Sequence, residues 1–169
     1  MSGFASKQSP TADKMDDKCA QVFRQIEFMH GSVLGMANVL TEADLAYRPW
    51  AGKRSLGELL GHMALLCSAD LRLSDGDTED QMKVYYRENR PDGLKESLLT
   101  LSRSVEELRG RYDLYTAASL EEKTTSWWGA TYTRFGWLVQ IAVHLAHHRG
   151  QLHSMLLTIG KDPERPLFE

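Results

Sequence analysis

The sequence predicts an all-α domain built as a four-helix bundle. Four segments carry apolar residues at alternating steps of three and four, which is the spacing of one buried helix face. The glycines and prolines fall mostly between these segments, and no useful stretch alternates polar and apolar residues as a half-buried strand does. Four long amphipathic helices bury their apolar faces best against one another, which favours the bundle.

Length and composition indicate one domain with a substantial core. The chain has 169 residues, of which 42% are hydrophobic and 25% charged. We expect residues 13–169 to form the domain and residues 1–12 to be a flexible N-terminus. No apolar run approaches the roughly 18–20 residues of a membrane span, and residues 1–12 lack the apolar core of a signal peptide. Cys19 and Cys67 are far apart and lie in helical patterns, which favours free thiols and a cytoplasmic location.

The charge pattern argues against nucleic acid as a partner. The net charge is −3, and the 20 basic residues are scattered among 23 acidic ones. The closest approach to a basic cluster, Lys83 to Arg90, is interrupted by Glu88. A nucleic-acid-binding domain usually concentrates its basic charge on one face or along one helix. We therefore expect a small molecule as the partner, with neither nucleic acid nor membrane.

The first two helices are defined by their apolar stripes and by one cap. The first stripe comprises Met15, Cys19, Val22, Ile26, Met29, Val33, Met36 and Leu40. The second helix is expected to begin at Ser55, which forms a capping-box pattern with Glu58, and to end near Gly76. Its stripe includes Leu56, Leu59, Leu60, Met63, Leu66 and Cys67.

The third and fourth helices follow the same logic. The third stripe comprises Leu94, Leu98, Leu101, Val105, Leu108, Tyr112 and Tyr115. The fourth helix is expected to begin near Thr133 and to end at Gly160, a favourable C-terminal cap, with Pro163 just beyond.

Three connections separate these helices. Residues 41–54 and 75–92 are each long for a tight antiparallel turn. At about 3.3 Å per extended residue, residues 75–92 could run the length of a helix of about 30 Å, so the second and third helices could be parallel. Residues 117–132 form another irregular connection that contains Trp127 and Trp128. These tryptophans either close the end of the bundle, the commoner role of large aromatic residues, or line a pocket.

Three histidines occupy positions where the helical period calls for apolar residues. His144 and His148 lie on the inward face of the fourth helix, and His62 lies on an inward stripe of the second. Burying imidazoles without partners costs about 1–3 kcal/mol each. Residues i and i+4 are neighbours on a helix, so His144 and His148 can present two nitrogens to one point. A third histidine would complete a site with an open position, as in catalytic zinc centres. The alternative is ordinary core histidines, because an H-x-x-x-H pair alone is a weak signal.

Four further residues are candidates for places beside this site. His147 lies about 60° from the inward stripe, and either Gln151 or Leu152 lies on it, so His147 and Gln151 are expected near the ligands rather than among them. His30 flanks the first stripe and is interpreted as a core-edge or pocket histidine that could touch a metal. Glu58 could accept a hydrogen bond from the non-metal nitrogen of the second-helix histidine, although its capping-box role alone explains its presence.

Two segments resemble the DinB/YfiT-like superfamily of metal-binding four-helix bundles. Leu40 to Met63 (LTEADLAYRPWAGKRSLGELLGHM) is similar to the family's junction between helices 1 and 2, ending in its helix-2 histidine. His144 to Pro166 (HLAHHRGQLHSMLLTIGKDPERP) is similar to its H-x-x-H-H-R-G-Q signature in helix 4. The matching parts are in order and span most of the domain, whereas the first and third helices match only in pattern.

The resemblance has consequences for cofactor and topology. It implies that His62, His144 and His148 hold a divalent metal ion, nickel or zinc, with iron or manganese as alternatives. It also implies a crossover between the second and third helices and frequent homodimers. A single monomeric mass by sedimentation would contradict the homodimer.

The resemblance and the open site together favour a metalloenzyme. Characterised members of the family include transferases and isomerases that use bacillithiol or mycothiol, so we expect a thiol-dependent transferase or a hydrolase of small molecules. Lys53, Arg134 and Arg149 could each anchor an acidic thiol, although surface charge is the more ordinary role. The alternative is a non-catalytic, stress-related dimeric bundle with a structural metal site, closed by a fourth ligand such as His30 or Glu58. No nucleophile elbow, phosphate-binding glycine loop or C-x-x-C pair competes with these interpretations.

Overall fold

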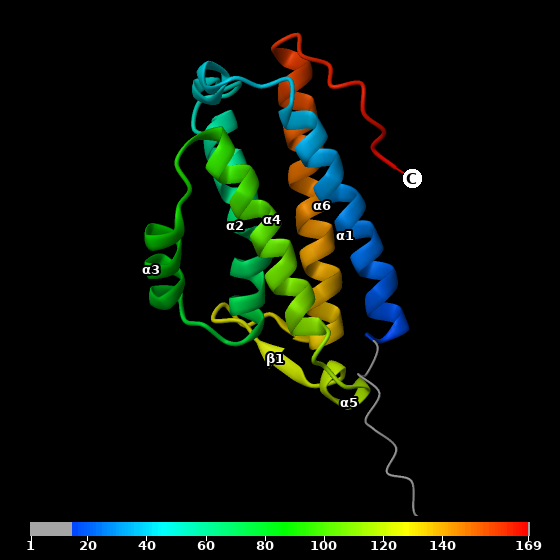
Figure 1. Cartoon of the computed structure of the whole chain (residues 1–169). Helices are drawn as coiled ribbons and strands as arrows, with labels where there is room; N and C mark the ends of the chain where they lie inside the picture. The colour runs from blue at the N-terminus through cyan, green and yellow to red at the C-terminus, as the bar shows by residue number, and fades with distance from the viewer. Residues whose placement is uncertain (1–14, 169) are drawn as a thin grey trace, which may run out of the picture.

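The structure is a computed structural model that describes residues 15–168, so the N-terminal segment expected to be flexible, residues 1–12, lies outside it. Four long helices lie side by side and form the bundle (Figure 1): α1 (Asp17–Ala37), α2 (Leu56–Ser74), α4 (Gly93–Tyr112) and α6 (Arg134–Thr158). The predicted all-α four-helix bundle is therefore confirmed. None of the described helices combines the length and the apolar character that a membrane span requires.

The core consists of the four apolar stripes. Its largest fully buried side chains include Phe23, Ile26, Met36, Leu56, Leu59, Met63, Leu66, Leu101, Leu108, Tyr112 and Leu138. Cys19 and Cys67 are free and buried, as expected of core residues. Burial, helped by Asp70, raises the pKa of the Cys67 thiol to about 12, so it remains protonated at neutral pH.

Helices α2 and α4 run in the same direction. At one end, Glu42 of the short 3-10 helix η1 (Glu42–Ala46), which precedes α2, accepts a hydrogen bond of 3.0 Å from the backbone N–H of Leu94 in α4. At the other end, Asp75 after α2 pairs with Arg111 in the last turn of α4 at 2.6 Å. The chain must therefore return along the bundle between α2 and α4 (Figure 1), which confirms the crossover.

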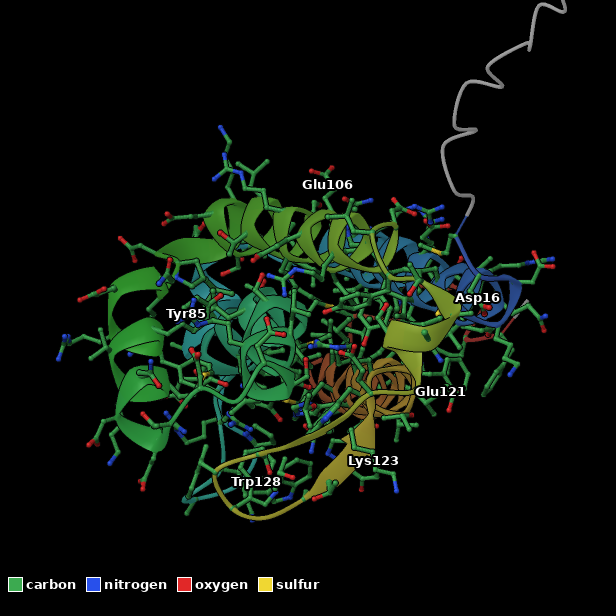
Figure 2. The ribbon with its side chains drawn as sticks, turned by 90° about the horizontal axis from the view of Figure 1, so that it is seen from below. Asp16, Tyr85, Glu106, Glu121, Lys123 and Trp128 are labelled. Carbon is green, nitrogen blue, oxygen red and sulfur yellow. The ribbon has the colours of Figure 1, made fainter. Side chains whose placement is uncertain are left out.

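The crossover contains a helix that the sequence analysis treats as plain connection. Helix α3 (Glu79–Asn89) begins with a capping box formed by Thr78 and Gln81 and lies outside α2, where Figure 2 labels Tyr85. Met82 is its buried residue and packs against Ala69 and Leu73 of α2. One buried position gives no apolar stripe, which explains why the helix was not predicted.

The connection before α6 holds a small hairpin, which corrects the expectation of an irregular segment. After the one-turn helix α5 (Ala117–Leu120), strands β1 (Lys123–Thr125) and β2 (Thr131–Thr133) pair antiparallel, with Lys123 opposite Thr133. Strands of three residues are too short to show a reliable alternation.

One tryptophan of the hairpin turn, Trp128, lines a pocket rather than closing the end of the bundle. Trp127 and Trp128 are 50% and 51% exposed. Trp128 packs edge-on against Trp137 of α6, with 6.5 Å between ring centroids. Figure 2, which views the bundle from one end, shows the Trp128 loop on the side of α2 and α6 that faces away from α4.

The predicted helix caps are present, while two helices end early. Ser55 and Glu58 form the expected capping box, and Thr133 caps α6 by accepting a hydrogen bond from the backbone N–H of Gly136. Gly160, just after α6, has φ +72°, a conformation that glycine adopts without strain. Helix α1 ends at Ala37 and α4 at Tyr112, one turn or less before the ends of their apolar stripes.

Candidate metal centre

Three imidazole nitrogens converge between α2 and α6. The Nε2 atom of His62 lies 3.4 Å from Nε2 of His144 and 2.9 Å from Nε2 of His148. The Nε2 atoms of His144 and His148 are 3.0 Å apart. Helix α2 supplies the first histidine and α6 the other two, one turn apart. The structure thus brings together the three histidines that the sequence singled out, as a group whose ligand atoms are close enough to share one metal ion.

A carboxylate fixes the ring of His144. Oδ2 of Asp70, a residue of α2 that is only 8% exposed, lies 2.7 Å from Nδ1 of His144. A carboxylate only accepts hydrogen bonds, so Nδ1 carries the proton and the lone pair is at Nε2. Sequence reasoning missed Asp70. The available signal was that Asp70 is the one acidic residue between Leu59 and Leu73.

An amide fixes the ring of His148 in the same way. Oε1 of Gln151, three residues later on α6, lies 2.7 Å from Nδ1 of His148. The amide oxygen accepts a hydrogen bond from the Nδ1–H group, so the proton is at Nδ1 and the lone pair is again at Nε2. Gln151 therefore lies directly beside the cluster.

The burial of the cluster keeps two of its imidazoles neutral. Burial lowers the pKa of His62 to about 3, with further lowering by the positive charge of Arg54 and by the two other rings. Burial also lowers the pKa of His148 to about 4, against the opposing effect of its hydrogen bond to Gln151. Neutral imidazole is the form that binds a metal ion, so these two histidines are ready to ligate at neutral pH.

The arrangement fits a divalent cation. With the protons of His144 and His148 at Nδ1, the two Nε2 atoms have no hydrogen to share across the 3.0 Å between them, and their lone pairs face each other. A cation among the three nitrogens resolves this repulsion. Three imidazoles each about 2.0–2.1 Å from a tetrahedral zinc ion would have nitrogens about 3.3 Å apart, close to the spacing in the cluster. Imidazole sets also accept nickel, iron and copper.

Glu58 and His30 lie outside the cluster and have other partners. Both carboxylate oxygens of Glu58 accept hydrogen bonds of 2.9 Å from the guanidinium of Arg48, and one also caps the Ser55 N–H. The Arg48 contact lowers the pKa of Glu58 to about 2. Nε2 of His30 lies 2.9 Å from the Ser102 hydroxyl between α1 and α4. The capping-box explanation of Glu58 is thus the one that the structure supports.

His147 lies at the edge of the cluster and faces solvent. Its ring packs edge-on against that of His148, with 4.9 Å between centroids, and its nitrogens are not part of the converging group. It borders two of the three cavities that surround the cluster.

Three cavities adjoin the cluster and share lining residues. One of about 920 Å³ lies on the Gln151 side, one of about 950 Å³ on the His62 side, and one of about 520 Å³ on the His144 side. Arg54, Tyr86 and His147 each border two of them. The smallest has an aromatic wall of Trp128, Tyr132 and Trp137. Small molecules can thus reach His62 from one cavity and His144 from another, while the third cavity borders Gln151 and His147 beside the cluster.

Of the three cations considered as thiol anchors, one borders these cavities. Lys53 lines the cavity on the Gln151 side, next to Arg54. Arg134 pairs with Asp75 and Glu122 at the end of the bundle. Arg149 lies between α6 and α1, in a different groove.

Comparisons with known proteins agree with this geometry. A family model of the DinB superfamily matches residues 25–152. A DinB-family protein from Exiguobacterium sibiricum is 31% identical, with a TM-score of 0.81 over 91% of this chain and 99% of that one. DinB-like proteins from Bacillus cereus and Bacillus subtilis share the fold at 20% and 16% identity, with TM-scores of 0.68 and 0.66. They cover 87% and 86% of this chain, and 96% and 95% of their own lengths.

A search of curated proteins gives no match. The histidine geometry, the parallel α2 and α4 and the family match together establish that the chain belongs to the DinB superfamily.

Proposed function

We propose that His62, His144 and His148 hold a divalent metal ion, and that the protein is an enzyme that uses it to activate a thiol or a water molecule. The observation that carries the proposal is the convergence of three Nε2 atoms whose separations are 2.9–3.4 Å. The hydrogen bonds of Asp70 and Gln151 direct two of the three lone pairs into that space. Nickel and zinc are the metals that the family resemblance favours.

The metal, when bound, would lower the pKa of a thiol or water and make its anion available at neutral pH. The chain's own residues do the rest. Asp70 and Gln151 hold the imidazole rings in place and keep the lone pairs of His144 and His148 at Nε2, where a cation would bind. His147 borders two cavities, where it can hydrogen-bond a bound substrate.

The other two candidate ligands, His30 and Glu58, are bonded to other residues, which favours an open metal site over a closed one. Within residues 15–168, the group able to share one ion contains the three histidines and no fourth side chain. His30 is bonded to Ser102, and Glu58 to Arg48. Structural zinc sites have four protein ligands, whereas catalytic sites keep a position for water or substrate. This comparison supports the enzyme over a metal that merely joins α2 to α6.

The cavity walls suggest the kind of substrate. The cations Lys53 and Arg54 border the cavity on the Gln151 side and suit a thiol that carries acidic groups. The aromatic wall on the His144 side, which includes Trp128 and Trp137, suits an apolar electrophile. The reaction that fits both walls is transfer of a low-molecular-weight thiol to an apolar small molecule, with metal-assisted hydrolysis as the version that needs only water.

We also propose that the protein is located in the cytoplasm. Cys19 and Cys67 are free, and a reducing compartment keeps such thiols unpaired. Low-molecular-weight thiols are also maintained in their reduced form there.

The test begins with the metal content of the purified protein, measured by elemental analysis. The protein is then stripped with a chelator, reloaded with zinc or nickel, and assayed with bacillithiol, mycothiol or glutathione and an aromatic electrophile. We expect activity only after reloading, and none in His144→Ala. His153→Ala, a change on α6 outside the cluster, is the matched control and keeps wild-type activity. A full equivalent of bound metal without thiol transfer or hydrolysis across the screen would favour the structural site.

A further inference from the structure

Two nitrogens of a buried guanidinium on the α1 side of α6 lack hydrogen-bond partners among residues 15–168. Arg149 follows His148 in sequence but lines a different groove, and it is only 7% exposed. Within the described part of the chain, its Nε and Nη1 atoms have no hydrogen-bond acceptor. Buried cations are normally paired, so two unmatched donors on a buried arginine call for an anionic partner.

The groove that Arg149 lines is mostly apolar. It has a volume of about 470 Å³, within the range of small-molecule sites, and lies between α1 and α6 beside the C-terminal segment. Its apolar wall includes Val22, Phe28, Val139, Ala146, Leu167 and Phe168, and Gln21 and Gln25 also border it. The rings of Phe28 and Phe168 each lie with their centroids 5.8 Å from the guanidinium carbon.

The two rings restrict what can reach the guanidinium. Aromatic rings near an arginine stabilise its charge but accept no strong N–H hydrogen bond at its edges. The donors at Nε and Nη1 therefore still require oxygen acceptors. A carboxylate supplies such acceptors and neutralises the charge. The rest of the groove offers mainly apolar contacts, so the remainder of the partner must be apolar.

We propose that this groove is a second binding site, separate from the histidine cluster, for an aliphatic carboxylate. The carboxylate accepts hydrogen bonds from Arg149, and the hydrocarbon chain packs between α1 and α6 along Phe28 and Val139. The site is independent of the proposed metal chemistry, because none of its lining residues belongs to the cluster.

The direct test is calorimetric titration of the full-length protein with decanoate, with decanol as the uncharged probe of similar length. We expect one decanoate per chain. Arg149→Met keeps the apolar stem and removes the charge, so it should weaken decanoate binding by about tenfold or more while changing decanol binding far less. Arg103→Met, on the exposed surface of α4, is the matched control and should bind decanoate as the wild type does.

A second variant tests the apolar wall without changing Arg149. Val139→Glu places a negative charge in the groove at a position that is already 39% exposed, so the fold should tolerate it. We expect it to abolish decanoate binding. The metal content of all variants should equal that of the wild type, which separates this site from the metal centre.

Three results would overturn the proposal. The first is the absence of decanoate binding to the wild type. The second is equal decanoate affinity in Arg149→Met and the wild type. The third is a wild-type dimer that Val139→Glu dissociates, because the groove would then be covered by a second copy of the chain.

Discussion

Oδ2 of Asp70 and Nδ1 of His144 lie 2.7 Å apart, so a carboxylate of α2 orients a ring of α6 at the metal centre. We predict that Asp70→Asn lowers metal affinity by about 10–100-fold, as is usual when a carboxylate behind a ligating histidine is lost. The amide no longer attracts the Nδ1 proton as strongly, so the lone pair is less firmly held at Nε2. Competition with a chromophoric chelator measures the affinity. Asp80→Asn, at the solvent-exposed start of α3, is the control and should leave affinity unchanged. Unaltered affinity in Asp70→Asn would show that the contact plays no part in metal binding.

His147→Gln is predicted to retain its metal. The ring packs against His148, but its nitrogens do not converge with the other three. Elemental analysis should find a metal content near that of the wild type, and activity should change only modestly. Loss of most of the metal would mean that the wrong histidine of the adjacent pair has been assigned as a ligand.

His148→Ala is predicted to lose the metal without unfolding. Removal of one of three nitrogens leaves a two-ligand site, whereas the fold rests on four apolar stripes. Each fully buried apolar side chain contributes about 1.5–3 kcal/mol, so these stripes outweigh one metal cross-link. Water can fill the small polar gap. Circular dichroism should show native helix content with a lower melting temperature. Stoichiometric metal in this variant would disprove the three-histidine assignment, and unfolding at room temperature would favour a structural metal.

The stability of the metal-free protein is predicted to fall as the pH is lowered from about 6.5 toward 4. Burial holds the pKa of His62 at about 3 and that of His148 at about 4, whereas in the unfolded chain both are near 6.5. Below that ordinary value the unfolded state binds more protons than the folded state, so protonation favours unfolding. Above about pH 6.5 both states are neutral, and these groups add no pH dependence.

Thermal melts of the chelator-treated protein across this range test the pH prediction. A His62→Gln, His148→Gln double variant is the reference and should show a shallower loss of melting temperature. Glu58 and Asp44, whose pKa values are about 2, lose their stabilising effect as the pH falls from about 4.5 toward 2, and both proteins contain them, so they do not produce a difference between the two profiles. Identical pH profiles for the two proteins would contradict the prediction.

The parts of the structure that periodicity could predict are those with a repeated apolar face. The four bundle helices and the inward positions of His62, His144 and His148 followed from spacing alone. The contact between His62 and the two histidines of α6 did not follow from spacing. The period of an apolar pattern gives the buried face of a helix, but it does not say which helix packs against that face. The family resemblance supplied that pairing.

The missed features share a physical reason. Helix α3 buries little beyond Met82, so it has no stripe, and only the Thr78 capping box signals it. The role of Asp70 was not predicted, because a helix stripe is identified from its apolar residues. A buried carboxylate indicates a functional contact only once its hydrogen-bond partner, here His144, is known. The unmatched donors of Arg149 are equally invisible in sequence, since charge alone suggests a surface residue.

The most direct test of the metal centre is a crystal structure of the protein loaded with zinc, with anomalous diffraction recorded at the zinc absorption edge. The account predicts one strong anomalous peak per chain, about 2.0–2.1 Å from Nε2 of His62, His144 and His148, with at least one coordination position left to solvent. A peak bound elsewhere, or one completed by a fourth protein side chain, would contradict the open three-histidine site.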